Sequence, residues 1–255
     1  MSELMIECVD VSVGQGEAPV LEHVDLRIQR GEIVVFLGSS GSGKSTLMRS
    51  LVGLLPPLAG DVHLLGQPLY SIETAERERV LHRAGMVFQH DALFGSMTVG
   101  DNVAMPLREL GTLPEPMIRE LVRTQLAMMG LPGMEDRAPD TLSGGERKRA
   151  ALARAAVNDP EIIFGDEPSA GLDPSVAATV DEALLRLRDV FGTTIVIVTH
   201  EMESVKRIAD RIVMFGNGTV AAKGTFTELQ NSNDDDIFKF FHRIAASPVQ
   251  ARGQT

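Results

Sequence analysis

The sequence lacks several features that would assign it to particular classes of protein. Cys8 is the only cysteine among 255 residues, so no internal disulfide can form and we expect a reducing compartment. No apolar run approaches the ~20 residues that a membrane-spanning helix needs. The first eight residues carry acidic side chains where a signal peptide carries basic ones, so we expect no such peptide. If the protein acts at a membrane, it must act through a partner.

Basic residues are also scarce. Lys and Arg total 24 against 35 Asp and Glu, which gives a net charge of −11. A chain this acidic is a poor candidate for binding nucleic acid, so we expect no nucleic-acid partner. A nucleotide is still compatible with this charge, because Mg²⁺, a lysine and backbone dipoles can neutralise its phosphates locally. A hydrophobic content of 44% suffices for the core of one large domain, with or without a subdomain.

A glycine-rich segment is the most specific motif that is present. It reads Gly38-Ser39-Ser40-Gly41-Ser42-Gly43-Lys44-Ser45-Thr46 and matches the P-loop pattern Gly-x-x-x-x-Gly-Lys-[Ser/Thr]. An apolar, strand-like run precedes it and a helical pattern follows, which argues against a chance glycine-rich loop. Backbone N–H groups and the helix dipole would converge on a phosphate there. We expect Lys44 to reach the β- and γ-phosphates of ATP, and Ser45 to bind Mg²⁺.

The pattern around this motif predicts an α/β fold with two additions. Short β-branched runs alternate with helical patterns before residue 90 and after residue 160, as in a parallel sheet. Alternating strands within residues 5–28 predict a small antiparallel β subdomain against the nucleotide domain. Between about residues 90 and 160 the pattern is helical, and we interpret this part as an inserted helical subdomain.

Polar side chains follow several of the predicted strands. In open α/β sheets, ligands lie beyond the carboxyl ends of the strands. We therefore expect Asp166 to hold Mg²⁺ and Glu167 to activate the attacking water as a base. Gln89 would complete the Mg²⁺ shell or orient that water, and His200 would hydrogen-bond the γ-phosphate. Each residue alone reads equally well as structural; together with the P-loop they indicate a catalytic site.

A second candidate phosphate site begins at Ser143. The run Leu142-Ser143-Gly144-Gly145-Glu146 predicts a capping box, and its two glycines expose N–H groups at the start of a helix. One ATP cannot use both phosphate sites of a compact domain if the helical insertion holds them apart. A two-fold homodimer, in which each chain supplies this site to the ATP of its partner, is the natural solution.

Taken together, these residues resemble the nucleotide-binding subunit of ATP-binding-cassette (ABC) transporters over residues ~4–228. The segments similar to its Walker A, Q-loop, signature, Walker B, D-loop and switch-histidine motifs are 38–46, Gln89, 142–146, 162–167, 169–173 and His200. The resemblance implies the ABC ATPase fold, a P-loop NTPase of RecA-like type, and an ATP hydrolase that uses ATP and Mg²⁺. It further implies that Ser143, Gly144, Gly145 and Asp173 contact the ATP of the partner subunit.

The resemblance also implies a location and partners. The homodimer would drive a multi-span membrane permease and lie peripherally at the cytoplasmic face of the inner membrane. We expect an ABC ATPase domain over residues 1–228 and a C-terminal tail over residues 229–255.

One departure from the family pattern concerns adenine, which the family usually stacks on an aromatic residue of the first strands. Val13 stands at the corresponding position, and residues 1–35 contain no aromatic side chain.

A finer resemblance concerns the segment after the Q-loop glutamine. Residues 88–94, 97–99, 101–109 and 149–155 and the tail ending in Phe240-Phe241 are similar to ATPases of MCE-linked phospholipid transport, the Mla type. This similarity implies an MCE-domain lipid-binding protein beside the permease. Amino-acid and methionine importers share part of the pattern and stay an alternative. A soluble, non-transport ABC ATPase is a weaker one, because such proteins usually carry two cassettes or a coiled-coil insertion. A P-loop kinase or GTPase would leave His200 without a role.

The C-terminal tail shows its own helical pattern. Three aspartates at 234–236 are placed to cap a helix whose apolar face carries Ile237, Phe240, Phe241 and Ile244. So short a helix needs a surface to cover. Two surfaces stay open: its own domain, or the second ATPase subunit, which the similar tail of the Mla-type subunits favours. We expect the polar residues 247–255 to be extended or disordered.

Overall fold

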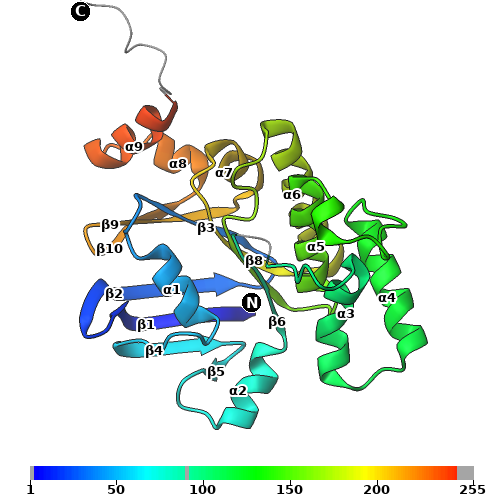
Figure 1. Cartoon of the computed structure of the whole chain (residues 1–255). Helices are drawn as coiled ribbons and strands as arrows, with labels where there is room; N and C mark the ends of the chain where they lie inside the picture. The colour runs from blue at the N-terminus through cyan, green and yellow to red at the C-terminus, as the bar shows by residue number, and fades with distance from the viewer. Residues whose placement is uncertain (1–2, 90–91, 246–255) are drawn as a thin grey trace, which may run out of the picture.

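The computed structural model describes residues 3–89 and 92–245, and within them the strands form two sheets (Figure 1). The N-terminal sheet is antiparallel, in the order β2-β1-β4-β5, as the alternating pattern predicts. Its strands are β1 (Leu4–Gln15), β2 (Ala18–Gln29), β4 (Ala59–Leu64) and β5 (Gln67–Pro68). This sheet is the predicted antiparallel β subdomain.

The second sheet has the order β10-β9-β3-β8-β7-β6, and every neighbouring pair is parallel except the hairpin of β9 and β10. Its strands are β3 (Ile33–Gly38), β6 (Ala84–Val87), β7 (Ile162–Asp166), β8 (Thr194–Val198), β9 (Arg211–Gly216) and β10 (Thr219–Gly224). β3 and β8 are buried at every residue, which explains why their sequences are apolar except for Thr194 at the start of β8. Asn217 and Gly218, with φ of 51° and 76°, close the hairpin as a tight turn requires.

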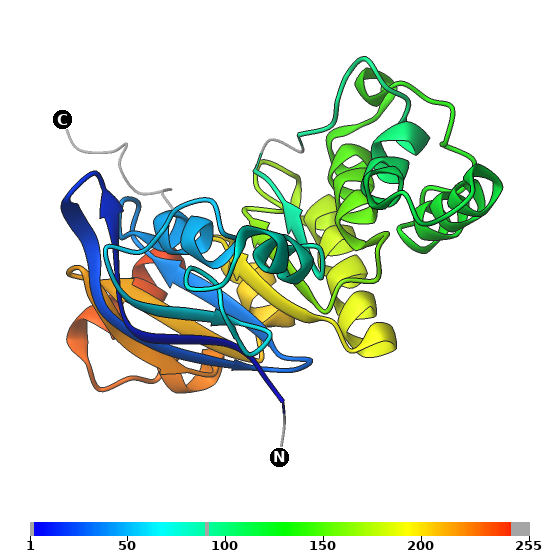
Figure 2. The same ribbon diagram turned by 90° about the horizontal axis from the view of Figure 1, so that it is seen from below.

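The helices cover both faces of the parallel sheet and extend beyond it. They are α1 (Lys44–Leu51), α2 (Thr74–Leu81), α3 (Val99–Leu110), α4 (Glu115–Met128), α5 (Gly144–Ala156), α6 (Pro174–Phe191), α7 (Met202–Ile208), α8 (Phe226–Gln230) and α9 (Asp235–Ala245), with a 3₁₀ turn at Pro139–Thr141. α3 and α4 project to one side of the sheets, and α5 connects them to the core (Figure 2). These three helices form the predicted helical insertion. No helix among the described residues is both long and apolar enough to cross a membrane.

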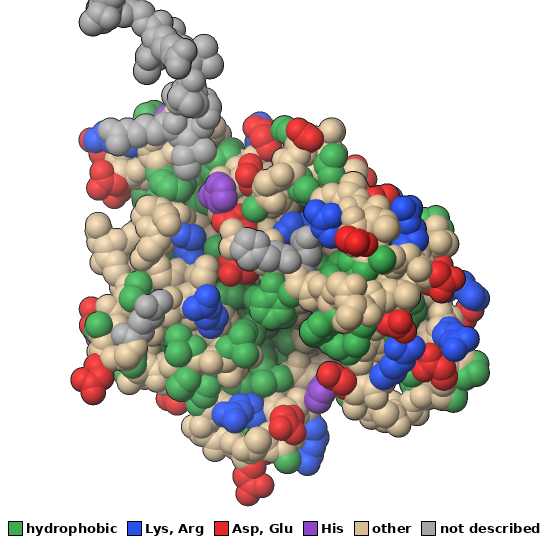
Figure 3. Space-filling view, in the orientation of Figure 1, with side chains coloured by type: hydrophobic (Ala, Val, Ile, Leu, Met, Phe, Trp, Pro, Cys, Tyr) green, Lys and Arg blue, Asp and Glu red, His purple; other side chains and the backbone are tan. Residues whose placement is uncertain are grey.

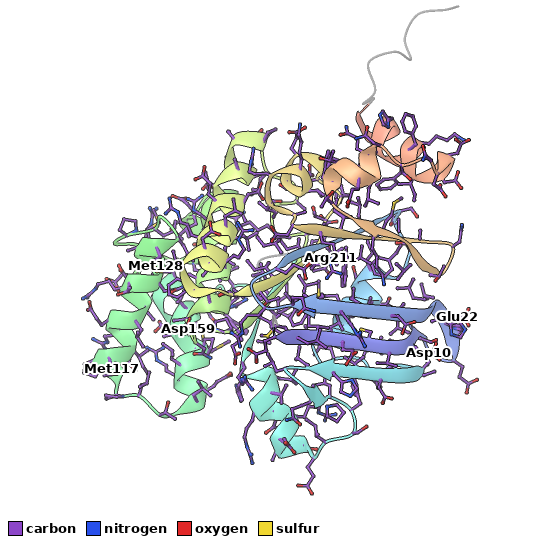
Figure 4. The ribbon with its side chains drawn as sticks, turned by 180° about the vertical axis from the view of Figure 1, so that it is seen from behind. Asp10, Glu22, Met117, Met128, Asp159 and Arg211 are labelled. Carbon is purple, nitrogen blue, oxygen red and sulfur yellow. The ribbon has the colours of Figure 1, made fainter. Side chains whose placement is uncertain are left out.

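The two sheets are joined by a shared core and by polar contacts. Leu47 and Met48 of α1 are buried in one cluster with residues of both sheets, including Ile6 and Phe36. Arg211, at the start of β9, donates to the carbonyl of Arg27 in β2 at 2.6 Å and pairs with Glu32 at 2.6 Å (Figure 4). The antiparallel sheet is therefore fixed against the parallel one, and residues of both can contribute to one site.

The tail helix α9 packs against its own domain. Ile237 and Phe241 are 8% and 3% exposed, and they join a core cluster with Val35 and Leu37 of β3. The ring of Phe241 also lies edge-on to that of Phe226 in α8, with the ring centres 5.5 Å apart. Of the two surfaces that the sequence left open, α9 covers the one within its own chain. The Ile244 side chain and residues 247–255 lie outside the described part.

Candidate functional site

One cavity brings together most of the residues that the motifs indicate. It has a volume of about 660 Å³ and lies at the carboxyl ends of β3, β7 and β8. Its lining consists of Val20, Gly38, Ser40, Gly41, Gly43, Lys44, Ser45, Thr46, Gln89, Asp166, Glu167, Val198 and His200. Open α/β sheets bind their ligands at this position. Ser39 and Ser42 of the glycine-rich motif are not in the lining and act on Lys44 instead.

Lys44 is held by its own loop. Its Nζ donates to the carbonyls of Gly38 and Ser39 at 2.9 and 2.7 Å and to Ser42 Oγ at 3.1 Å. The residue is 9% exposed, and burial lowers the pKa of its ammonium, while the nearby Glu167 and Asp166 carboxylates act in the opposite direction. The loop thus engages all three N–H donors of the ammonium, and a phosphate must replace at least one of these contacts to bind it.

Two glycines of the loop have no room for a side chain. A Cβ on Gly38, with φ of 144°, would lie 2.3 Å from the Phe215 carbonyl oxygen. One on Gly43, with φ of 90°, would lie 2.5 Å from Cγ of Leu21. Gly43 directly precedes α1, whose first residues line the cavity. The positive end of the α1 dipole therefore lies at the cavity, where it favours an anion.

Three oxygen-bearing side chains in the lining fit a magnesium ion. Ser45 Oγ donates to Asp166 Oδ1 at 3.3 Å, and Gln89 follows β6, the strand beside β7. Hydroxyl, carboxylate and amide oxygens are ligands that Mg²⁺ accepts, usually together with water and substrate phosphates. Among residues 3–89 and 92–245, no group of three or more His, Cys, Asp or Glu side chains could hold a metal. A set of hydroxyl, carboxylate and amide oxygens suits an ion whose other ligands are water and phosphate oxygens.

Glu167 occupies a strained backbone position. Its φ is 52°, which is rare for a residue with a Cβ, and its N–H donates to the Val198 carbonyl at 2.8 Å. Oε1 lies 2.7 Å from Nδ1 of His200, and within the described residues Oε2 is buried without a hydrogen-bond partner. Such an oxygen is a strong acceptor because desolvation leaves it unsatisfied. The geometry suits a carboxylate that takes a proton from water while His200 orients it.

The second candidate phosphate site lies outside this cavity. The Ser143 N–H donates to Glu146 Oε2 at 2.7 Å and the Glu146 N–H donates to Ser143 Oγ at 3.3 Å, which is the predicted capping box. The first of these bonds lowers the pKa of the Glu146 carboxyl. Ser143, Gly144, Gly145 and Asp173, expected to contact a partner's ATP, are absent from the described lining. The two phosphate sites are therefore separate within one chain.

Val20 is a cavity residue that the sequence did not indicate. Val13, the position expected beside adenine, is fully buried and cannot contact a base. Val20 of β2 lines the cavity instead, and its Cγ1 would lie 3.2 Å from a Cβ on Gly43. This proximity arises because the antiparallel sheet packs against the P-loop, and no local sequence signal indicates it. His90 and Asp91, part of the segment with the finer resemblance, lie outside the described residues.

A second, apolar cavity lies where β6 meets the helical subdomain. Its volume is about 290 Å³, and its lining is Ala84, Gly85, Met86, Phe88, Ala92, Phe94, Met105, Pro106, Arg154, Ala155, Asn158 and Pro160. Phe88 and Phe94 are 41% and 48% exposed. Hydrophobic side chains gather on this face of the molecule (Figure 3). An exposed apolar area of this kind is typical of a surface that binds another protein.

Comparison with known proteins finds a matching family model and similar proteins of known name. A family model described as ABC transporter matches residues 21–170. The intermembrane phospholipid transport system ATP-binding protein MlaF of Haemophilus influenzae is 35% identical, over 98% of this chain and 95% of that protein. The methionine import ATP-binding protein MetN of Lacticaseibacillus paracasei is 37% identical, over 87% of this chain and 63% of that protein.

A solved structure shares the fold. The dimeric, post-hydrolysis structure of the ATP-binding cassette MJ0796, bound to ADP and Pi, superposes with a TM-score of 0.79. It covers 87% of this chain and 98% of its own, at 30% sequence identity.

Proposed function

Because the chain belongs to the ABC transporter family and is an ATPase subunit of it, we propose that it drives MCE-linked phospholipid transport between bacterial membranes. One observation carries the substrate class: the similarity to MlaF extends over 98% of this chain and 95% of that protein. The chain spans only 63% of the MetN relative, although the identities of 35% and 37% do not separate the two. A methionine-type importer is therefore the second candidate.

The proposed reaction assigns a task to each group in the cavity. Lys44 and the N–H groups of residues 38–46 bind the β- and γ-phosphates. Ser45, Asp166 and Gln89 would hold Mg²⁺, which neutralises charge on the phosphates. Glu167 accepts the proton of the attacking water at a carboxylate oxygen. His200, 2.7 Å from Glu167, orients that carboxylate and is placed to hydrogen-bond the γ-phosphate.

The assembly that we propose is a homodimer with two shared ATP sites. Ser143, Gly144, Gly145 and Asp173 of each chain would complete the site of the other chain. Two observations support this arrangement: these residues are separate from the chain's own cavity, and the similar MJ0796 cassette is dimeric. We assign residues 1–228 to the ATPase domain and 229–255 to the tail.

The apolar cavity beside Phe88 and Phe94 would receive a cytoplasmic helix of a multi-span permease. The subunit would then lie peripherally at the cytoplasmic face of the inner membrane, with an MCE-domain protein completing the complex. The cavity supports this proposal because its two phenylalanines remain exposed in the single chain.

Purification of the tagged chain from detergent-solubilised membranes tests the assignment. We expect an MCE-domain protein and a multi-span permease to co-purify. Phe94→Glu should release both partners, because a carboxylate cannot enter an apolar cavity without loss of solvation. The matched control is Phe191→Glu, since Phe191 is 45% exposed against 48% for Phe94 but is absent from the lining of this cavity.

The outcomes separate the two candidates. A permease that co-purifies with a solute-binding protein for amino acids, and without an MCE-domain protein, would favour the importer. Partners retained by a folded Phe94→Glu variant would contradict the proposed docking cavity.

A further inference from the structure

Two buried cations of α5 contact the segment that carries Gln89. Lys148 and Arg154 are 5% and 8% exposed. Lys148 Nζ donates to the carbonyl of Gln89, and Arg154 Nη1 donates to the carbonyl of Ala92 at 2.6 Å. Burying a cation costs free energy unless hydrogen bonds compensate the loss of water. The bonds to the two carbonyls therefore offset part of the cost of burying these cations, and their loss would be unfavourable.

The contacts depend on how α5 packs against β6. A Cβ on Gly85 of β6 would lie 2.1 Å from the Ala155 carbonyl oxygen, so the end of α5 lies directly on this strand. Gln89 comes two residues after the end of β6. Ala92 has a φ of 49°, which is uncommon for a residue with a Cβ, and it is the residue whose carbonyl Arg154 binds. α5 thus contacts the chain two residues after the end of β6 and again at the strained residue Ala92.

Lys148 lies between two parts of the proposed catalytic machinery. Gln89 lines the nucleotide cavity together with Ser45 and Asp166. Ser143, the N-cap of α5, comes five residues before Lys148 on the same helix. A helix is a stiff element that transmits displacement along its length. Ser143 and Gln89 are therefore connected through α5 and one hydrogen bond.

We propose that Lys148 is a positioning residue that sets the place of Gln89 through its backbone carbonyl. Contact of Ser143 with the partner's ATP is thereby transmitted to the Mg²⁺ side of the chain's own ATP. Arg154 makes the corresponding contact with the carbonyl of Ala92. This role rests on the proposed function, since it takes Gln89 and Ser143 as ATP contacts.

Lys148→Met tests the role in the purified transporter complex, because it removes the ammonium and keeps a side chain of similar length. We expect kcat for ATP hydrolysis to fall about tenfold or more, as small misplacements of catalytic groups do, while KM for ATP stays within about twofold. The Mg²⁺ concentration for half-maximal activity should rise. Lys148→Arg should recover most of the activity, because a guanidinium can donate to the same carbonyl.

Lys223→Met is the control for the loss of a lysine bond to a backbone carbonyl, at an exposed position. Lys223 Nζ also donates to a backbone carbonyl, but its acceptor Asp25, unlike Gln89, is absent from the described lining of the nucleotide cavity. This variant should keep the kcat and the Mg²⁺ dependence of the unmodified protein. If Lys148→Met does not fold, Lys148→Gln replaces it, since its shorter amide leaves the carbonyl out of reach and should lower kcat in the same way.

A double-mutant cycle with Gln89→Ala identifies the route of the effect. If Lys148 acts through Gln89, Lys148→Met should lower kcat less than about twofold further in the Gln89→Ala background. Full additivity of the two losses, or an unchanged kcat in folded Lys148→Met, would overturn the proposed role.

Hydrogen exchange of the full chain without nucleotide separates this role from the proposed function. Lys148→Met should accelerate exchange in the peptide that contains Gln89, and Lys223→Met should not. If exchange changes but the unmodified complex does not hydrolyse ATP, the positioning contact stands and the proposed function is wrong. If the unmodified complex hydrolyses ATP and the Lys148→Met exchange is unchanged, the positioning role is wrong.

Discussion

Single residues show how far the sequence predicts the site. The motifs at 38–46 and 162–167 predict a shared site for Lys44, Ser45, Asp166 and Glu167, because a strand pattern precedes each motif. All four residues line the nucleotide cavity. Neither Val20 nor Lys148 could be predicted. Lys148 meets Gln89 across 59 positions of sequence, and only the packing of α5 on β6 brings the two together. The φ of 52° at Glu167 also depends on tertiary structure, because nothing in its residue type favours it.

Glu167→Gln should bind ATP and stall before hydrolysis. The amide cannot accept a proton, so we expect single-turnover hydrolysis to slow by about a hundredfold or more. The closed, ATP-bound dimer should accumulate and be visible by size-exclusion chromatography. Glu203→Gln, an exposed carboxylate of α7, is the control and should hydrolyse normally. Near-normal turnover by Glu167→Gln in the assembled complex would exclude this residue as the base.

Cys8 should resist thiol reagents in the folded protein. It is 2% exposed, and burial raises the pKa of its thiol to about 12, so at neutral pH the reactive thiolate is scarce. We expect no labelling by a maleimide over hours at pH 7, followed by complete labelling in denaturant, with mass spectrometry as the readout. An exposed cysteine introduced as Ser96→Cys should label within minutes under native conditions. Rapid native labelling of Cys8 itself would show that β1 opens.

At the scale of elements, long patterned segments are predictable and short ones are not. The P-loop strand, α1, β8 and the helical insertion follow from periodicity and flanking motifs. The two-residue β5 is too short to produce a pattern. α8 is short, but the sequence carries a signal for it: Thr225 and Glu228 form a capping box like that of α5. The surface against which α9 packs could not be predicted, because an apolar face does not specify what it covers.

Ending the chain after Gln230 should destabilise the isolated domain. Ile237 and Phe241 are buried, and burial of such a side chain contributes about 1.5–3 kcal/mol each. We expect a lower midpoint of urea unfolding. Phe241→Ala should reproduce much of the effect, whereas Phe238→Ala, at a residue 44% exposed, should change little. Unchanged unfolding together with reduced dimerisation would show that the tail acts between subunits.

At the scale of the whole molecule, mixing two inactive variants tests whether the two candidate phosphate sites act across a dimer. A Lys44→Ala chain and a Gly144→Asp chain should each be inactive as homodimers. Mixed in equal amounts, they form heterodimers with one intact site, so roughly a quarter of the unmodified activity should return if the sites are independent. No recovery, in heterodimers verified by differential tags, would contradict two independent sites that are shared between the chains.

The presence of Val20 in the cavity wall has a consequence for nucleotide selectivity. Its isopropyl group comes from the antiparallel sheet and offers a nucleobase contact area but no hydrogen bond to its edge. Recognition would then depend mainly on the triphosphate, which Lys44 and the glycine-rich loop would bind independently of the base. We therefore expect GTP to compete with ATP for this site, and hydrolysis of GTP far slower than that of ATP would show that other groups read the base.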